Sequence, residues 1–165
     1  PYKGIRLLPA GETLALNILR RHRLWELFLT EALNVSWSDV HEEAEMLEHH
    51  TSDFLIDKID EYLNFPKFDP HGEPIPDKNG ILPEMPITTV LGKCKIGNIY
   101  KVMKVNDENS ALISFLSQIG INLYKKIKLI EKFEYDNSLI IEVDGLKHTI
   151  SEKISNKISV IEIEN

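Results

Sequence analysis

A proline-rich stretch in the middle of the chain constrains the fold more than any other feature. Six of the eight prolines lie between Phe65 and Pro86, at positions 66, 70, 74, 76, 83 and 86. Proline lacks a backbone N–H and fixes φ, so neither a helix nor a central strand can run through such a stretch. The sequence therefore predicts a linker over residues 66–87 that separates two differently patterned parts.

The part before this linker has the apolar spacing of helices. Apolar residues recur every three or four positions over residues 11–33, which predicts one long helix. Two shorter segments, 36–49 and 52–63, follow after polar residues that can cap them, and each predicts another helix. We expect a mainly α domain of three helices over residues 11–65. The broad apolar faces of the last two helices predict that this domain forms a homodimer.

The part after the linker alternates between apolar and polar residues, as strands do. This alternation occupies four segments, which are residues 99–105, 127–133, 139–143 and 158–163. The pair Asp144-Gly145 predicts a hairpin turn after the third of them. Ser110 can cap a short helix between the first two. We therefore expect a small β-barrel domain with one helix over residues 88–165.

Charge is distributed unevenly along the chain. Residues 1–90 carry 8 Lys and Arg against 16 Asp and Glu, a net charge of −8, whereas residues 91–165 carry 11 against 10, a net charge of +1. Five of the six histidines also lie in the first part. Phosphate contacts need a basic surface, so this balance argues against nucleic-acid binding by this piece alone. It favours the binding of cations.

Cysteine content and hydropathy indicate the compartment in which the protein resides. The single cysteine, Cys94, excludes an internal disulfide framework and a zinc site built from several thiolates. No apolar run is long enough to predict a membrane span. We therefore expect a cytoplasmic protein without a membrane partner.

Two neighbouring predicted helices concentrate metal-ligating side chains. The candidate ligands are His22, Glu26, His41, Glu45, Glu48 and His49. The last four fall within roughly 100° of one helical face, and the first two are four residues apart and share a face. Like charges placed so close together need a cation. Imidazole and carboxylate without thiolate suit Mn²⁺ or Fe²⁺, with Zn²⁺, Co²⁺ or Ni²⁺ as substitutes in vitro.

Two alternative functions use the same residues differently. One is a metalloenzyme with a His/Glu site, but the residues three before His49 and His50 are Met46 and Leu47, so the Glu-x-x-His pairs of di-iron oxidases are missing there. The His-Glu-x-x-His motif of zinc hydrolases is not matched at His41 either. We therefore do not expect an enzyme. The other alternative is a metal-independent interaction module whose acidic face is solvated.

Four motifs resemble the DtxR/MntR family of metal-dependent transcriptional repressors. They occupy residues 8–12, 21–26, 40–49 and 74–76. The resemblance implies the metal-sensing and dimerisation portion of a DNA-binding regulator of manganese or iron homeostasis, followed by an SH3-like, FeoA-type domain over residues 88–165. Residues 1–10 resemble the end of the wing of a winged-helix domain. The resemblance thus implies that the full-length protein binds operator DNA and that this fragment does not.

The same resemblance divides the ligands between two metal sites. Those of the primary, activating site are Glu45, Glu48 and His49, which a side chain of the DNA-binding domain completes in the family. Those of the ancillary site are His22, Glu26 and His41, to which the SH3-like domain can contribute. Asp107 and Glu108 are candidates for that contribution.

Two further positions matter in the resemblance. Asp69 and His71 resemble a variant in which the linker turn supplies ligands. Glu45 stands where iron-responsive members typically have cysteine and manganese-responsive members have glutamate. The carboxylate suits the preference of Mn²⁺ for oxygen and therefore favours manganese over iron.

Overall fold

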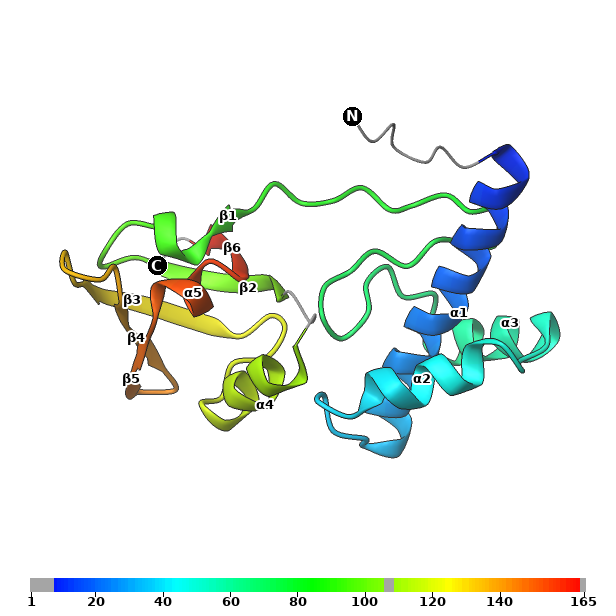
Figure 1. Cartoon of the computed structure of the whole chain (residues 1–165), viewed down its shortest axis with the longest axis horizontal. Coiled ribbons are helices and arrows are strands. Elements are labelled where there is room, and N and C mark those ends of the chain that lie inside the picture. Colours follow the sequence, from blue (N-terminus) through cyan, green and yellow to red (C-terminus); the bar gives the residue numbers. More distant parts are fainter. Residues whose placement is uncertain (1–7, 106–108, 164–165) are drawn as a thin grey trace, which may run out of the picture. The chain divides into compact units, whose positions relative to one another are not determined.

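The computed structural model describes residues 8–105 and 109–163, and the chain divides into two compact units. The first unit holds the residues up to Asp69 together with Glu73–Glu84, and the second holds Pro70–Gly72 together with the residues from Met85 onward. Figure 1 shows helices in the first unit and an antiparallel sheet with short helices in the second. The predicted fold class, a mainly α part followed by a small β domain, is confirmed.

Within the described residues, the first unit contains the three predicted helices. They are α1 (Pro9–Leu33), α2 (Val40–Glu48) and α3 (Asp53–Tyr62). Helix α1 starts two residues earlier than predicted because Pro9 fits the first turn, where its missing N–H costs nothing. Asn34 ends the same helix in the left-handed conformation, with φ of 55°. None of the described helices is long and apolar enough to cross a bilayer.

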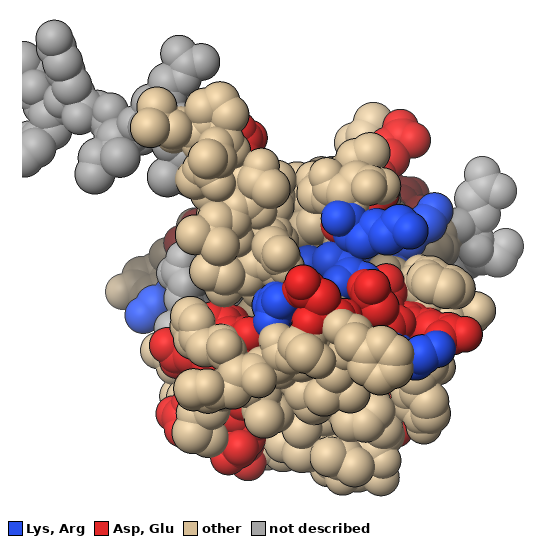
Figure 2. Space-filling model, turned by 90° about the vertical axis from the view of Figure 1, so that its right-hand side faces the viewer, with Lys and Arg blue, Asp and Glu red and all other residues tan. Residues whose placement is uncertain are grey.

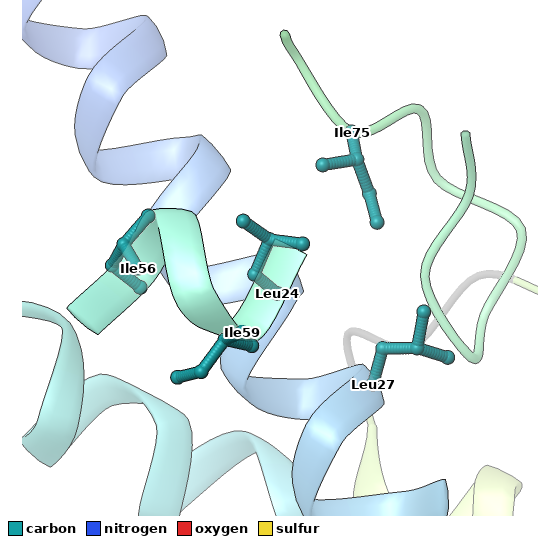
Figure 3. Close-up of a cluster of buried hydrophobic side chains, with 5 residues drawn as sticks. All are labelled: Leu24, Leu27, Ile56, Ile59 and Ile75. Carbon is teal, nitrogen blue, oxygen red and sulfur yellow. The ribbon is translucent and has the colours of Figure 1, made fainter. Parts of the chain in front are cut away.

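Apolar residues from α1, α3 and the proline-rich stretch form the core of the first unit. The cluster, drawn in Figure 3, consists of Leu24, Leu27, Ile56, Ile59 and Ile75. Burial of each such side chain contributes about 2 kcal/mol. Because Ile75 comes from the proline-rich stretch, the part of that stretch over Glu73–Glu84 packs within the first unit and does more than connect two domains.

A second cluster and a hydrogen-bond chain hold α2 against α1. The cluster consists of Leu29, Val40 and Ala44, all buried. At the other end of α2, the indole of Trp25 donates to Thr51 Oγ1 at 2.7 Å, and that hydroxyl donates to the Leu47 carbonyl at 2.6 Å. These contacts fix both ends of α2 on α1, so the side chains that α2 directs toward α1 have defined partners.

The second unit is built on one antiparallel sheet with the strand order β1-β6-β2-β3-β4-β5. Its strands are β1 (Thr89–Val90), β2 (Ile99–Val105), β3 (Lys126–Lys132), β4 (Leu139–Val143), β5 (Leu146–Ile150) and β6 (Ile158–Ile163). Its helices are η1 (Leu91–Lys93), α4 (Ser110–Gln118) and α5 (Glu152–Ser155). The four predicted strands and the hairpin at Asp144-Gly145 are confirmed. The helix cap was predicted wrongly, because Asn109, not Ser110, accepts the N–H of Ala111.

A tight turn from the proline-rich stretch packs within the second unit. The carbonyl of His71 accepts the backbone N–H of Val105 at 2.9 Å. At Gly72 the backbone has φ of +87°, and a Cβ there would lie 2.1 Å from the Met103 carbonyl oxygen. Glycine alone fits both this conformation and this contact.

Charged side chains join α1 and α3 on one face of the first unit. Arg20, which is almost wholly buried, pairs with Asp57 at 3.1 Å and with Asp60 at 2.7 Å. On the outside of α3, Lys58 pairs with Glu61 at 2.6 Å. Figure 2 shows basic and acidic side chains gathered on this side of the molecule. Arg20 therefore neutralises part of the negative charge that the sequence concentrates in residues 1–90.

The buried ion pairs should carry more stability than the exposed one. Replacing Arg20 by Ala should lower the free energy of unfolding of the first unit by about 2 kcal/mol, because the largely buried Asp60 then loses its cation. Lys58→Ala, which breaks an exposed pair on the same helix, should cost much less, because water screens that pair. Urea titration followed by helical circular dichroism measures both, and equal losses would contradict the difference in burial.

Candidate metal centre

Three side chains from α1 and α2 converge at the point where the two helices pack. His22 Nε2 lies 3.0 Å from Glu26 Oε1 and 3.0 Å from His41 Nδ1, and His41 Nδ1 lies 3.0 Å from the same Glu26 oxygen. We call this arrangement the His22 triangle. In the part of the chain that the structure describes, it is the group of three potential ligands whose donor atoms cluster closely enough to share one ion.

The dimensions of the His22 triangle suit a divalent cation. In octahedral coordination with bonds of about 2.1 Å, neighbouring ligand atoms lie about 3.0 Å apart. The three edges of the triangle have this length, so its atoms match one face of an octahedron. Two imidazole nitrogens and one carboxylate oxygen suit Mn²⁺, Fe²⁺ or Zn²⁺, and the absence of sulfur from this set disfavours softer ions.

Burial gives the triangle its electrostatic character. Glu26 is 1% exposed and Glu48, which lies on the other side of the His22 ring, is 8% exposed. Burial alone lowers the pKa of His22, but hydrogen bonds and negative charge from Glu26 and Glu48 outweigh it and raise the pKa above its usual value. A positive charge is thus favoured between the two carboxylates. A bound cation and the His22 proton compete to supply it.

Glu48 contacts the triangle in a way that the sequence did not predict. Its Oε2 accepts a hydrogen bond from His22 Nδ1 at 2.7 Å, and its Oε1 lies 3.1 Å from His49 Nε2. Glu45 is exposed on α2, and among the described residues no hydrogen bond or ion pair connects it to Glu48 or His49. Of the three residues predicted for a primary site, Glu48 and His49 contact each other, and Glu45 lies about one turn before them on α2.

The linker-turn residues occupy different units. Asp69 belongs to the first unit, where it pairs with Arg23 at 3.5 Å and accepts the N–H of Glu73 at 2.9 Å. His71 is buried in the second unit. The pairing with Arg23 gives Asp69 a structural partner that sequence spacing did not reveal. Asp107 and Glu108, and residues 1–7 of the predicted wing, lie outside the described residues.

Two family models match consecutive parts of the chain. Residues 8–77 match the model described as "Iron dependent repressor, metal binding and dimerisation domain". Residues 89–162 match the FeoA domain. The His22 triangle lies wholly within the first match. The order of the two domains, with the metal-binding helices first, defines a class of metal-dependent regulator.

Relatives with known names agree with this class. The iron-dependent repressor IdeR of Mycobacterium tuberculosis is 35% identical over 74 residues, which are 45% of this chain and only 32% of IdeR. A solved manganese-dependent transcriptional repressor in complex with manganese has a TM-score of 0.87 and 34% identity, covering 96% of this chain and 76% of that one. ScaR with bound Zn²⁺ has a TM-score of 0.79 and 32% identity, covering 97% and 79%. The chain belongs to the DtxR/MntR family of metal-dependent transcriptional repressors.

Removing one member of the triangle should weaken metal binding. Glu26→Gln and His41→Ala should each lower the affinity for Mn²⁺ by more than tenfold, because each removes a charged or lone-pair donor from a set of three. Glu43→Gln removes the same charge as Glu26→Gln from an exposed position of α2 and should change the affinity less than twofold. Calorimetric titration of chelator-treated protein makes the comparison. Equal affinities in all three variants would count against the triangle as a ligand set.

Proposed function

We propose that this chain is the metal-sensing and dimerisation portion of a transcriptional repressor that responds to manganese or iron. The observation that carries the proposal is the His22 triangle, whose three atoms come from two helices and lie 3.0 Å apart. Family membership supplies the regulatory context. The single cysteine, Cys94, suits the reducing cytoplasm in which we place the protein.

The side chains suggest which metal the protein senses. The triangle and the neighbouring Glu45 and Glu48 offer nitrogen and oxygen, which suits Mn²⁺ and is compatible with Fe²⁺. A relative of known structure is manganese-dependent, and IdeR is iron-dependent. Glu45 lies where a cysteine would favour iron, so we propose Mn²⁺ as the principal ion. Zn²⁺, Co²⁺ and Ni²⁺ should substitute in vitro.

Sensing requires that occupancy of the site alter the helices that carry it. His22 and Glu26 belong to α1 and His41 belongs to α2, so one ion held by all three cross-links the two helices. The ion would supply positive charge against the buried carboxylate of Glu26. We propose that this cross-link stiffens the helical unit and thereby sets the spacing of two DNA-reading domains in a homodimer.

Operator binding by the full-length protein should depend on the triangle. Mn²⁺ should raise the affinity for operator DNA by about fivefold or more, the usual range for coupling between sites. Glu26→Gln should reduce this gain, whereas Glu43→Gln should preserve it, since only Glu26 belongs to the triangle. Fluorescence anisotropy with labelled DNA, with and without chelator, measures the gain. Operator affinity that ignores Mn²⁺ and Fe²⁺ alike would contradict the proposal.

Exposed apolar residues on α2 and α3 support the dimer. On α3 the core face is formed by Ile56 and Ile59, so the broad apolar face predicted for this helix is only partly buried. The large apolar side chains left exposed on the two helices are Met46, Phe54, Leu55 and Tyr62. Apolar surface of this kind is typical of an interface.

A charge placed on this surface should disrupt the dimer. Phe54, which is 74% exposed on α3, would be buried in the proposed interface. Phe54→Glu should therefore raise the dimer dissociation constant at least tenfold, because a carboxylate would lose its hydration there. Tyr135→Glu, at a fully exposed aromatic residue of the second unit, serves as the control. Sedimentation equilibrium distinguishes them, and a wild-type monomer at high concentration would overturn the dimer itself.

A further inference from the structure

We propose that Glu48 is a positioning residue of the His22 triangle, in addition to the ligand role that its place beside His49 suggests. This inference rests on the proposed function, since it takes the triangle to be a metal site. Glu48 is the last residue of α2, seven positions after His41, and its carboxylate reaches across to His22 on α1. It touches the His22 ring on the side opposite the triangle.

The hydrogen bond between Glu48 and His22 determines which ring nitrogen can bind metal. A carboxylate oxygen only accepts, so the Nδ1 atom of His22, at 2.7 Å from Glu48 Oε2, donates its proton to that oxygen. When an ion takes the place of a proton on Nε2, the ring keeps its remaining proton on Nδ1 and offers the lone pair of Nε2. That atom is the one that lies 3.0 Å from both Glu26 Oε1 and His41 Nδ1. Glu48 therefore selects the tautomer that the triangle needs.

The same contact should strengthen His22 as a ligand. A carboxylate behind an imidazole raises the basicity of the opposite nitrogen and restricts rotation of the ring, and loss of such a partner typically costs 10–100-fold in metal affinity. Glu48 is well placed for this effect because it is 8% exposed, where water competes little for its oxygens. Glu43 and Glu45, exposed on the same helix, have no contact of this kind in the described structure.

The two oxygens of Glu48 contact one residue of each predicted metal site. Oε1 lies 3.1 Å from His49 Nε2, whereas Oε2 is engaged with His22. The two oxygens thus serve different neighbours, and one carboxylate can orient His22 while it stands beside His49. Glu48 consequently acts on the triangle through its hydrogen bond with His22.

The decisive comparison replaces Glu48 in a His49→Ala background, which disables the neighbouring set of ligands. Glu48→Ala should weaken Zn²⁺ and Mn²⁺ binding at the triangle by 10–100-fold. Glu48→Gln, whose amide oxygen can still accept from Nδ1, should lose less. Glu43→Gln removes a charge from an exposed position of the same helix that belongs to neither ligand set and should leave the affinity within about twofold. Circular dichroism verifies that each variant keeps its helices.

The tautomer provides a readout that a purely structural role would not move. In the Zn²⁺-loaded protein, the nitrogen chemical shifts of His22 should show a protonated Nδ1 and a metal-bound Nε2. Glu48→Gln should retain a slowly exchanging, hydrogen-bonded Nδ1 proton, whereas in Glu48→Ala that proton should lose its acceptor and exchange rapidly with water. If the Glu48 variants match Glu43→Gln in both affinity and exchange of the His22 Nδ1 proton, the positioning role is wrong. If His22→Ala leaves binding unchanged, the proposed metal site itself fails, which is a separate outcome.

Discussion

The His22 ring lies between two buried carboxylates, and the arrangement of α1 and α2 depends on satisfying them. Glu26 approaches one ring nitrogen at 3.0 Å and Glu48 approaches the other at 2.7 Å. Carboxylates removed from water are costly unless a cation or hydrogen-bond donors compensate them. A protonated His22 can do so without metal, and a bound ion can do so in its place. Under the proposed function, a bound ion would therefore take the place of one His22 proton.

The rest of the helical unit serves to place these groups. Ala44, which is fully buried, allows α2 to approach α1 closely, and Val40 packs beside it. At the far end, Thr51 is held by the Trp25 indole and by Arg21, which donates to the Thr51 carbonyl. These contacts keep the end of α2, and thus Glu48, over His22. Rigid supports of this kind are what a metal site needs if ligand geometry is to be set before the ion arrives.

Periodicity predicted the three helices of the first unit and four strands of the second, and it grouped candidate ligands on common helical faces, but it did not predict the neighbours that only tertiary packing defines. The spacing of His22 and Glu26 fixed their common face, and the approach of His41 followed from the resemblance. The contact between Glu48 and His22 depends on how far along α1 the second helix lies, which a helical wheel does not contain. Tertiary packing likewise determines that Ile56 of α3 faces the core and that Asp69 pairs with Arg23, and helical spacing predicted neither contact.

Crystallographic location of the ion would test the central claim most directly. Crystals of the chain grown with Mn²⁺ and measured near the manganese absorption edge should show an anomalous peak bonded to His22 Nε2, Glu26 Oε1 and His41 Nδ1, the three atoms that lie 3.0 Å apart. Glu48 Oε2 should remain on His22 Nδ1 in the same map. Crystals that contain manganese but show no peak at these three atoms would contradict the assignment of the His22 triangle as a metal site.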